Sequence, residues 1–255
     1  MLSGRPLLDN QVDAGFFVDR EEPLARIERA VERGLNTLVC GDPGIGKTTL
    51  LRHLAYRTRT PGLSPIVDFP VRFVRAEGIN EGPLLLDRII DRQPGLSDLE
   101  MLAKLGEQRA ELVDETRSRT QTGGNDAAGS ILQPVIVVDD VTATAGHTLF
   151  GLLRDEVWAT NFLWIVSTRT NDRGGLLTPP ADAFFDSVIN LGPLTSSAAT
   201  ALINTRAGVD LGSLPDEVFQ MVGGNPRLLL ATVRDLLDRP PSQHRARLDV
   251  LRWRD

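Results

Sequence analysis

The fold is decided by the stretch Gly41-Asp42-Pro43-Gly44-Ile45-Gly46-Lys47-Thr48. It fits the pattern G-x-x-x-x-G-K-[ST], in which glycines let backbone N–H groups turn toward phosphate oxygens without a Cβ clash. The apolar run at 37–40 before it is typical of a buried strand, and Leu50, Leu51 and Leu54 after it mark a helix. Strand, glycine-rich loop and helix N-terminus in this order predict a site for the phosphates of a nucleoside triphosphate.

Each part of this stretch has an expected task. Lys47 is expected to reach the β- and γ-phosphates and so to act in catalysis, and the Thr48 hydroxyl is expected to ligate Mg²⁺. The residues expected to line the nucleotide phosphates are Gly41, Asp42, Pro43, Gly44, Ile45, Gly46, Lys47, Thr48 and Thr49.

Two acidic residues end the next strongly apolar run. The residues at 135–138 are all β-branched, which suits a parallel strand buried on both faces, and Asp139 and Asp140 follow them. In P-loop enzymes a carboxylate at the end of a strand holds the Mg²⁺, and Asp139 fits that role. We expect Asp140 to orient or polarise the attacking water.

A third signal is the run Ile165-Val166-Ser167-Thr168-Arg169, in which a buried strand ends in polar groups. Ligands of open α/β sheets bind at the carboxyl ends of the strands. Arg169 is therefore expected to reach the γ-phosphate and to report whether it is present.

The rest of the chain alternates between apolar runs and stretches with helical periodicity. Strands are expected at 37–40, 71–74, 135–138, 162–166 and 187–191, and helices at 23–33, 84–90, 97–112 and 149–158. After residue 194 only helices are expected, at 196–206, 215–222, 226–237 and 245–253. This alternation predicts a parallel five-stranded α/β sheet followed by an all-helical lid.

The same pattern predicts the domain organisation. Residues 1–15 would form an N-terminal tail, 16–193 the nucleotide-binding domain and 194–255 the helical lid. A polar, glycine-rich stretch at about 119–131 is typical of a flexible surface loop within the first domain.

Composition narrows the class of protein. The net charge of −6 does not favour nucleic acid or an anionic membrane surface as a partner, although a local basic patch stays possible. Cys40 is the single cysteine, which fits a reducing compartment. No apolar run approaches the roughly 20 residues of a spanning helix, and we expect a cytoplasmic protein without membrane contact.

The order of these motifs resembles the STAND branch of the AAA+-related ATPases, with NB-ARC and NACHT domains among its members. The matching segments are FVDREE at 17–22, GDPGIGKTTL at 41–50, VIVVDDV at 135–141, STR at 167–169, LGPLTSSAATALI at 191–203 and GGNPRLL at 223–229. Asp19 stands where the family usually has a glycine.

The resemblance implies the finer expectations. The strand order would be 5-1-4-3-2, and ATP or ADP would be the nucleotide, with Pro226 against the adenine and Val18 and Arg20 flanking the base from the other side. The chain would be a slow, Mg²⁺-dependent ATPase that acts as a signalling switch on separate partner proteins or on copies of itself. Two alternatives stay open: a ring-forming AAA+ ATPase acting on DNA or protein, and a scaffold that holds nucleotide without hydrolysis.

Overall fold

The structure is a computed structural model, and it describes residues 2, 4–66, 71–90, 95–121, 133–240 and 243–244. The described residues pack as two compact units. One unit takes its residues from Met1–Glu22, Asp42–His53 and Leu191–Asp255, and the other from Pro23–Gly41 and Leu54–Asn190. Each unit has a hydrophobic core of its own. The domain bounds expected from the sequence stay a prediction.

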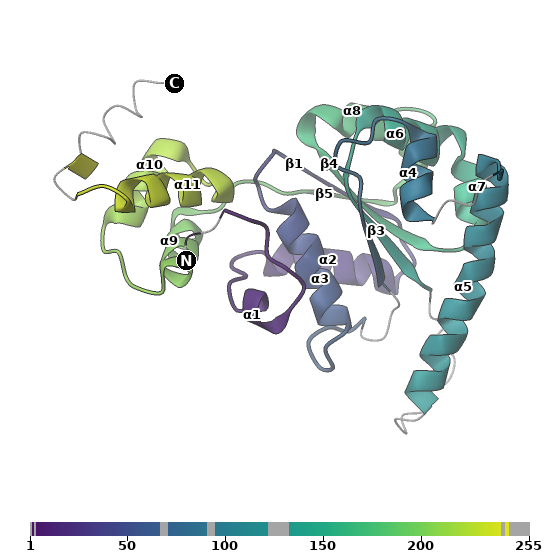
Figure 1. The fold of residues 1–255 in the computed structure, drawn as a ribbon, viewed down its shortest axis with the longest axis horizontal. Coiled ribbons are helices and arrows are strands. Elements are labelled where there is room, and N and C mark those ends of the chain that lie inside the picture. The colour runs from purple at the N-terminus through teal and green to yellow at the C-terminus, as the bar shows by residue number, and fades with distance from the viewer. Residues whose placement is uncertain are drawn as a thin grey trace. The chain divides into compact units, whose positions relative to one another are not determined.

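The larger unit is built on a five-stranded parallel sheet with the order β2-β3-β4-β1-β5 (Figure 1). The strands are β1 (Thr37–Gly41), β2 (Val71–Arg75), β3 (Val135–Val141), β4 (Leu163–Arg169) and β5 (Ser187–Asn190). All neighbouring strands run parallel. This confirms the expected α/β P-loop fold and the expected order, here read from the opposite edge.

Helices cover the sheet because its strands are apolar on both faces. They are α2 (Glu21–Glu32), α4 (Gly82–Ile89), α5 (Asp98–Gln121), α6 (Ala143–His147), α7 (Arg154–Ala159) and α8 (Arg173–Leu176), with short η1 (Thr148–Leu152), η2 (Thr170–Asp172) and η3 (Ala181–Phe184). The helix α3 (Lys47–Thr58) is divided between the two units after His53. The core against α4, α5 and α7 buries alternate strand residues, among them Ile136, Val138, Trp164 and Val166. Burial of these side chains fixes the register of β3 against β4.

Two expected elements differ from the structure. The single helix expected at 149–158 is instead the π-helical turn η1 followed by α7, and α6 precedes them directly. Gly151 lies in that turn, where an added Cβ would be 3.3 Å from Ala181 and Pro180, so the wider turn packs closely against η3. The helix α5 continues to Gln121, past the expected end at 112; residues 122–131 of the expected flexible loop lie outside the described residues.

The smaller unit contains three lid helices, which are α9 (Ser196–Ala207), α10 (Leu214–Val222) and α11 (Pro226–Leu237), and the short N-terminal α1 (Gln11–Ala14). The lid helices share a core that includes Ile203, Val218, Leu229 and Val233. All three were expected close to these bounds. The helix expected at 245–253 lies outside the described residues. Within the part of the chain that the structure describes, no helix is long and apolar enough to cross a bilayer.

Candidate functional site

The phosphate loop, residues 42–48, joins the end of β1 to the start of α3. Gly44 and Gly46 have φ values of +83° and +107°, which residues with a side chain rarely adopt, so the two glycines allow the turn. Lys47 is the first residue of α3, is only 7% exposed and donates from Nζ to the Asp42 carbonyl at 3.2 Å. The backbone N–H groups of a helix's first turn lack intrahelical partners, which makes this end of α3 suited to an anion.

The start of α11 is bonded to this loop, within the same unit. Asn225 caps the helix by accepting from the N–H groups of Arg227 and Leu228, and its amide Nδ2 donates to the Pro43 carbonyl at 3.0 Å. The Arg227 N–H also reaches the Gly44 carbonyl at 3.4 Å. A Cβ on Gly44 would lie 2.8 Å from the Arg227 Cβ, so the close approach itself requires glycine.

The segment before α11 is equally confined. Leu194 donates its N–H to the Gly224 carbonyl at 2.8 Å, and a Cβ on Gly224 would collide with the Leu194 backbone. Pro226, expected against the adenine, is the first residue of α11, where its fixed φ suits the helix start. Its contact with a base stays a prediction.

The N-terminal strap, residues 5–13, is tied to the beginning of α3. The Leu7 N–H donates to Thr49 Oγ1 at 3.3 Å, and Arg52 donates to the Leu7 carbonyl at 3.3 Å. The strap is closed by Asp13, which is 4% exposed and accepts from Arg5 at 2.5 and 3.0 Å. The hydrogen bond from Arg5 holds the pKa of the Asp13 carboxyl below its usual range.

The residues expected to flank the base follow the strap. Asp19 has φ +54° and so adopts the left-handed backbone that glycine adopts readily, at the position where proteins of the STAND branch usually have a glycine. Arg20 donates to the carbonyls of Gly192 at 2.8 Å and Ile45 at 3.4 Å, and burial lowers the pKa of its guanidinium. Val18 is half-buried. Arg20 thus links the phosphate loop to the segment that leads into α9.

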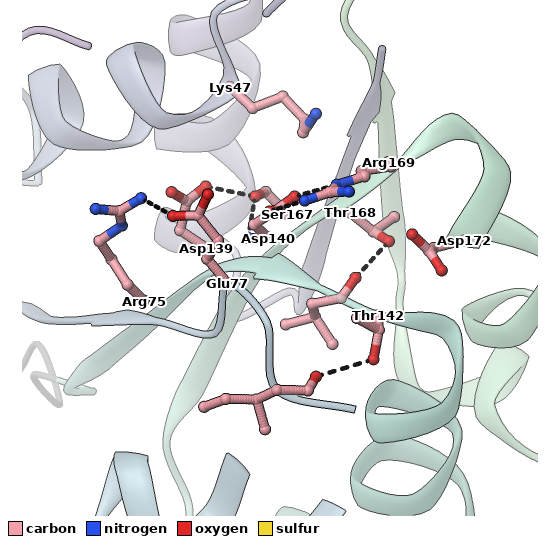
Figure 2. Close-up of polar contacts among 12 residues, drawn as sticks. Lys47, Arg75, Glu77, Asp139, Asp140, Thr142, Ser167, Thr168, Arg169 and Asp172 are labelled. Atoms are coloured by element: carbon pink, nitrogen blue, oxygen red, sulfur yellow. Dashed lines mark hydrogen bonds and ion pairs between the residues drawn. The ribbon is translucent and has the colours of Figure 1, made fainter. Parts of the chain in front are cut away.

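In the larger unit, the acidic edge is formed by Asp139 and Asp140 of β3 with Ser167 and Arg169 of β4 (Figure 2). The register between the two strands shifts between Val138 and Val141, which leaves the two aspartates in a bulge. Asp140 has φ +65°, a conformation that aspartate tolerates better than most residues. The bulge therefore turns two successive side chains out of the regular alternation of the strand.

Side chains of β4 replace the regular ladder bonds across this bulge. Ser167 Oγ donates to Asp139 Oδ1 at 2.6 Å and accepts from the Asp140 N–H at 2.9 Å. Thr168 Oγ1 donates to the Val141 carbonyl at 2.7 Å. With Arg169, which binds the Asp140 carboxylate, three consecutive residues of β4 thus bind the bulge or the residue that follows it.

The ion pair of Arg169 and Asp140 joins the residue expected to reach the γ-phosphate to the residue expected to orient the attacking water. Nε and Nη2 of Arg169 donate to the two carboxylate oxygens at 3.0 and 2.7 Å (Figure 2). The hydrogen bond and charge of Asp140, with the charges of Asp172 and Glu77, raise the pKa of the Arg169 guanidinium. Arg169 is 47% exposed, so this pair contributes less to stability than a buried one would.

The donor chemistry of the expected metal ligands fits Mg²⁺. Asp139 supplies a buried carboxylate and Thr48 a hydroxyl, and Mg²⁺ in nucleotide sites is held by one or two protein oxygens with phosphates and waters. Among the described residues, no group of three or more His, Cys, Asp or Glu side chains is placed to hold a metal ion.

Three residues contribute to this geometry that the sequence had not assigned to a site. Ser167 was visible only as a polar residue at the end of a strand. Asn225 preceded a proline at a helix start, a pattern that signals an N-cap. Nothing in the sequence indicated that the Arg227 backbone meets Gly44, because that contact joins segments far apart in the chain.

No protein-family model matches the sequence, and a comparison with curated proteins finds no match either. Similar solved structures include a Walker-type ATPase of Pyrococcus abyssi, with 15% identity and a TM-score of 0.64, over 97% of this chain and 75% of that one. Cdc6p of Pyrobaculum aerophilum has 18% identity and a TM-score of 0.55, over 87% of this chain and 64% of that one. The Orc1 protein of Aeropyrum pernix, solved with DNA, has 17% identity and a TM-score of 0.57, over 92% and 66%.

At these identities the likeness concerns the fold. The chain has a five-stranded α/β P-loop NTPase fold like that of these structures, and it spans slightly less than two thirds of the Cdc6p and Orc1 structures. This likeness does not distinguish the STAND branch from other P-loop ATPases.

Proposed function

We propose that this chain binds ATP with Mg²⁺ at the phosphate loop, hydrolyses it slowly, and uses the nucleotide state to set the position of its helical lid. The observation that carries the proposal is the bonding of Asn225 and Arg227 to Pro43 and Gly44. A phosphate bound by the loop would contact the same loop whose residues Pro43 and Gly44 are hydrogen-bonded to the start of α11. Nucleotide exchange or hydrolysis would then change the support of that helix.

The chemistry would be divided among few groups. The backbone of the loop and Lys47 would hold the β- and γ-phosphates, while the Thr48 hydroxyl and the Asp139 carboxylate would ligate Mg²⁺, which screens phosphate charge. Asp140 would accept a hydrogen bond from the attacking water. Arg169 would exchange its bond with Asp140 for the γ-phosphate, so that the same movement frees the carboxylate for water.

The choice of adenine rests on the resemblance to the STAND ATPases. Val18, Arg20 and Pro226 are proposed to enclose the base. Arg20 supports this assignment in part, because its bond to the Ile45 carbonyl brings the residue to the loop. The same proposal includes a cytoplasmic location and either protein partners or nucleotide-dependent self-association.

Substitution of Asp140 by asparagine tests the hydrolytic step. Asparagine tolerates the same left-handed backbone, so the bulge keeps its shape. Loss of a general base typically costs about 10²- to 10⁴-fold in rate, and we expect such a loss in Mg²⁺-dependent phosphate release. ATP affinity, measured by calorimetry, should stay within about threefold of wild type because the loop is untouched.

The matched control is Asp182→Asn, which removes one charge from an exposed aspartate of η3. It should hydrolyse ATP like wild type. Normal turnover in Asp140→Asn would contradict the role given to this carboxylate. Tight nucleotide retention by wild type without any phosphate release would favour the alternative of a nucleotide-bound scaffold.

A second candidate is a ring-forming ATPase that acts on DNA, which the similarity to the Orc1 structure solved with DNA favours. The net charge of −6 weighs against it. Light scattering with and without ATP tests this candidate, because a nucleotide-dependent ring supports it and a persistent monomer counts against it. Salt-sensitive binding to duplex DNA would support it further.

A further inference from the structure

We propose that Ser167 is a positioning residue that holds the carboxylate of Asp139 and the backbone of Asp140, and that its hydroxyl raises the affinity of the site for Mg²⁺. The proposal rests on the function proposed above. Ser167 touches no reacting atom and acts through Asp139 and Asp140.

The direction of both hydrogen bonds follows from elementary chemistry. The backbone N–H of Asp140 can only donate, so Ser167 Oγ is the acceptor of that bond. The single hydroxyl proton is then available for Asp139, and its 2.6 Å distance is typical of a hydroxyl donating to an ionised carboxylate. Ser167 is 0% exposed, so no water competes for either bond.

The two bonds have different consequences for the two aspartates. The bond to Oδ1 fixes the plane of the Asp139 carboxylate, as partners of metal ligands do in other sites. The bond from the Asp140 N–H holds the backbone at φ +65°, where the register of the strands is broken. A single hydroxyl therefore sets the orientation of a proposed metal ligand and of the proposed base beside it.

The next residue on the strand shows what a purely structural hydroxyl does here. Thr168 is as deeply buried as Ser167, but its Oγ1 donates to the backbone carbonyl of Val141. It helps to close the bulge without touching a carboxylate. Figure 2 shows the two hydroxyls serving these different partners.

The test measures Mg²⁺ dependence rather than activity. Binding of the non-hydrolysable analogue AMP-PNP is followed by calorimetry at increasing free Mg²⁺ and in EDTA. Removal of a partner of a metal ligand typically costs about 10- to 100-fold in metal affinity, and we expect Ser167→Ala to raise the half-saturating Mg²⁺ concentration by about that factor. Affinity in EDTA should match wild type, and Ser167→Thr, which keeps the hydroxyl, should restore most of the Mg²⁺ response.

The control is Thr160→Val, which removes a buried hydroxyl that donates to the Val157 carbonyl at 2.6 Å. It should leave the Mg²⁺ dependence unchanged. If Ser167→Ala does not fold, Ser167→Cys replaces it, because a thiol is a weaker donor of similar size and should give a smaller shift in the same direction.

The outcomes separate the two proposals. An unchanged Mg²⁺ dependence in a folded Ser167→Ala variant overturns the role of Ser167 while the nucleotide site stands. Failure of the wild type to bind AMP-PNP overturns the proposed function and this inference together. An equal loss of affinity with and without Mg²⁺ also overturns the inference, because it indicates a general disturbance of the nucleotide site.

Discussion

The phosphate loop is shaped by its backbone, whereas the acidic edge is shaped by its side chains. The loop is shaped by backbone conformation, since Gly44 and Gly46 take positive φ and the groups offered to a ligand are mainly N–H donors. The acidic edge is shaped by side chains, since Ser167 and Arg169 hold Asp139 and Asp140 across a bulge. A backbone site is specified by consecutive residues, whereas a side-chain site needs two strands to be in register.

This difference predicts how each region fails. Changes in the loop should abolish ligand binding or strain the backbone, because the loop needs the positive φ values that Gly44 and Gly46 adopt. Changes at the acidic edge should leave nucleotide binding intact and reduce Mg²⁺ binding or hydrolysis. Substitutions in the loop and in the strap beside it test the first half of this comparison, and Lys47 is expected to give the largest effect.

Lys47→Ala should give the largest loss of nucleotide affinity. It removes a charged donor to the phosphates, and hydrogen bonds to charged groups are worth about 1.5–3 kcal/mol, or roughly 10- to 150-fold in the dissociation constant. Calorimetry with ATP in EDTA measures it without any contribution from Mg²⁺. The control is Lys104→Ala on α5, which removes the other lysine of the sequence. Wild-type affinity in Lys47→Ala would break the comparison, because the loop would then not be the phosphate site.

Gly44→Ala should destabilise the ligand-free protein more than Gly78→Ala. The two glycines have φ values of +83° and +81°, so alanine causes the same backbone strain of roughly 1–2 kcal/mol at each. A Cβ at Gly44 also meets Arg227 and Asn225 at 2.8 and 2.9 Å, whereas a Cβ at Gly78 meets no atom within 4 Å. Overpacking should add about 1–3 kcal/mol at Gly44, measured by urea denaturation.

Equal destabilisation in the two glycine variants would mean that α11 can leave the loop at little cost. That result would sharpen the comparison, because the lid would then be only loosely tied to the phosphate loop. It would also remove the observation on which the proposed switch depends.

The smallest expected effect concerns the strap that supports α3. The pKa of Asp13 is lower in the folded chain than its ordinary value of 3.8, so the folded state binds this proton less readily than the unfolded state. The resulting stability is fully present above about pH 4 to 5 and is lost as the pH falls through the lowered pKa. Asp13→Asn should cost about 1–3 kcal/mol near neutral pH, because it removes a charged partner of Arg5.

Thermal unfolding of wild type and Asp13→Asn between about pH 7 and pH 3 measures this dependence. The difference in stability between the two proteins should shrink toward the acidic end, because wild type loses the ion pair there. Asp182→Asn serves as the control with an exposed aspartate. A constant difference across the range would mean that the Asp13 carboxylate does not stabilise the strap through its charge.

Much of the fold could be predicted because its signals are local. The β-branched run of β3 and the glycines of the loop identify their own structure, and Pro226 and Gly208 mark helix ends. The π-helical turn η1 could not be predicted, since its periodicity differs from an α-helix by a single inserted residue. The length of α5 was underestimated because its C-terminal half lacks an apolar stripe readable from sequence.

The site residues divide in the same way. Lys47, Asp139 and Asp140 were identifiable because each belongs to a contiguous motif, and their roles at a nucleotide stay predictions. Ser167 was not identifiable, because its task depends on a register shift between β3 and β4. The pairing of Arg169 with Asp140 was also hidden, since 29 positions separate the two residues along the chain.

The left-handed backbone at Asp140 restricts which acid this position accepts. Aspartate and asparagine tolerate positive φ through their short polar side chains, whereas glutamate gains no such compensation. Exchange of one acid for the other, which looks conservative, is therefore the costlier substitution at 140, and the neutral amide is the cheaper one. A variant that carries glutamate at position 140 would therefore need a different backbone at the bulge. Because Ser167 of β4 binds that backbone, β3 and β4 would have to be changed together.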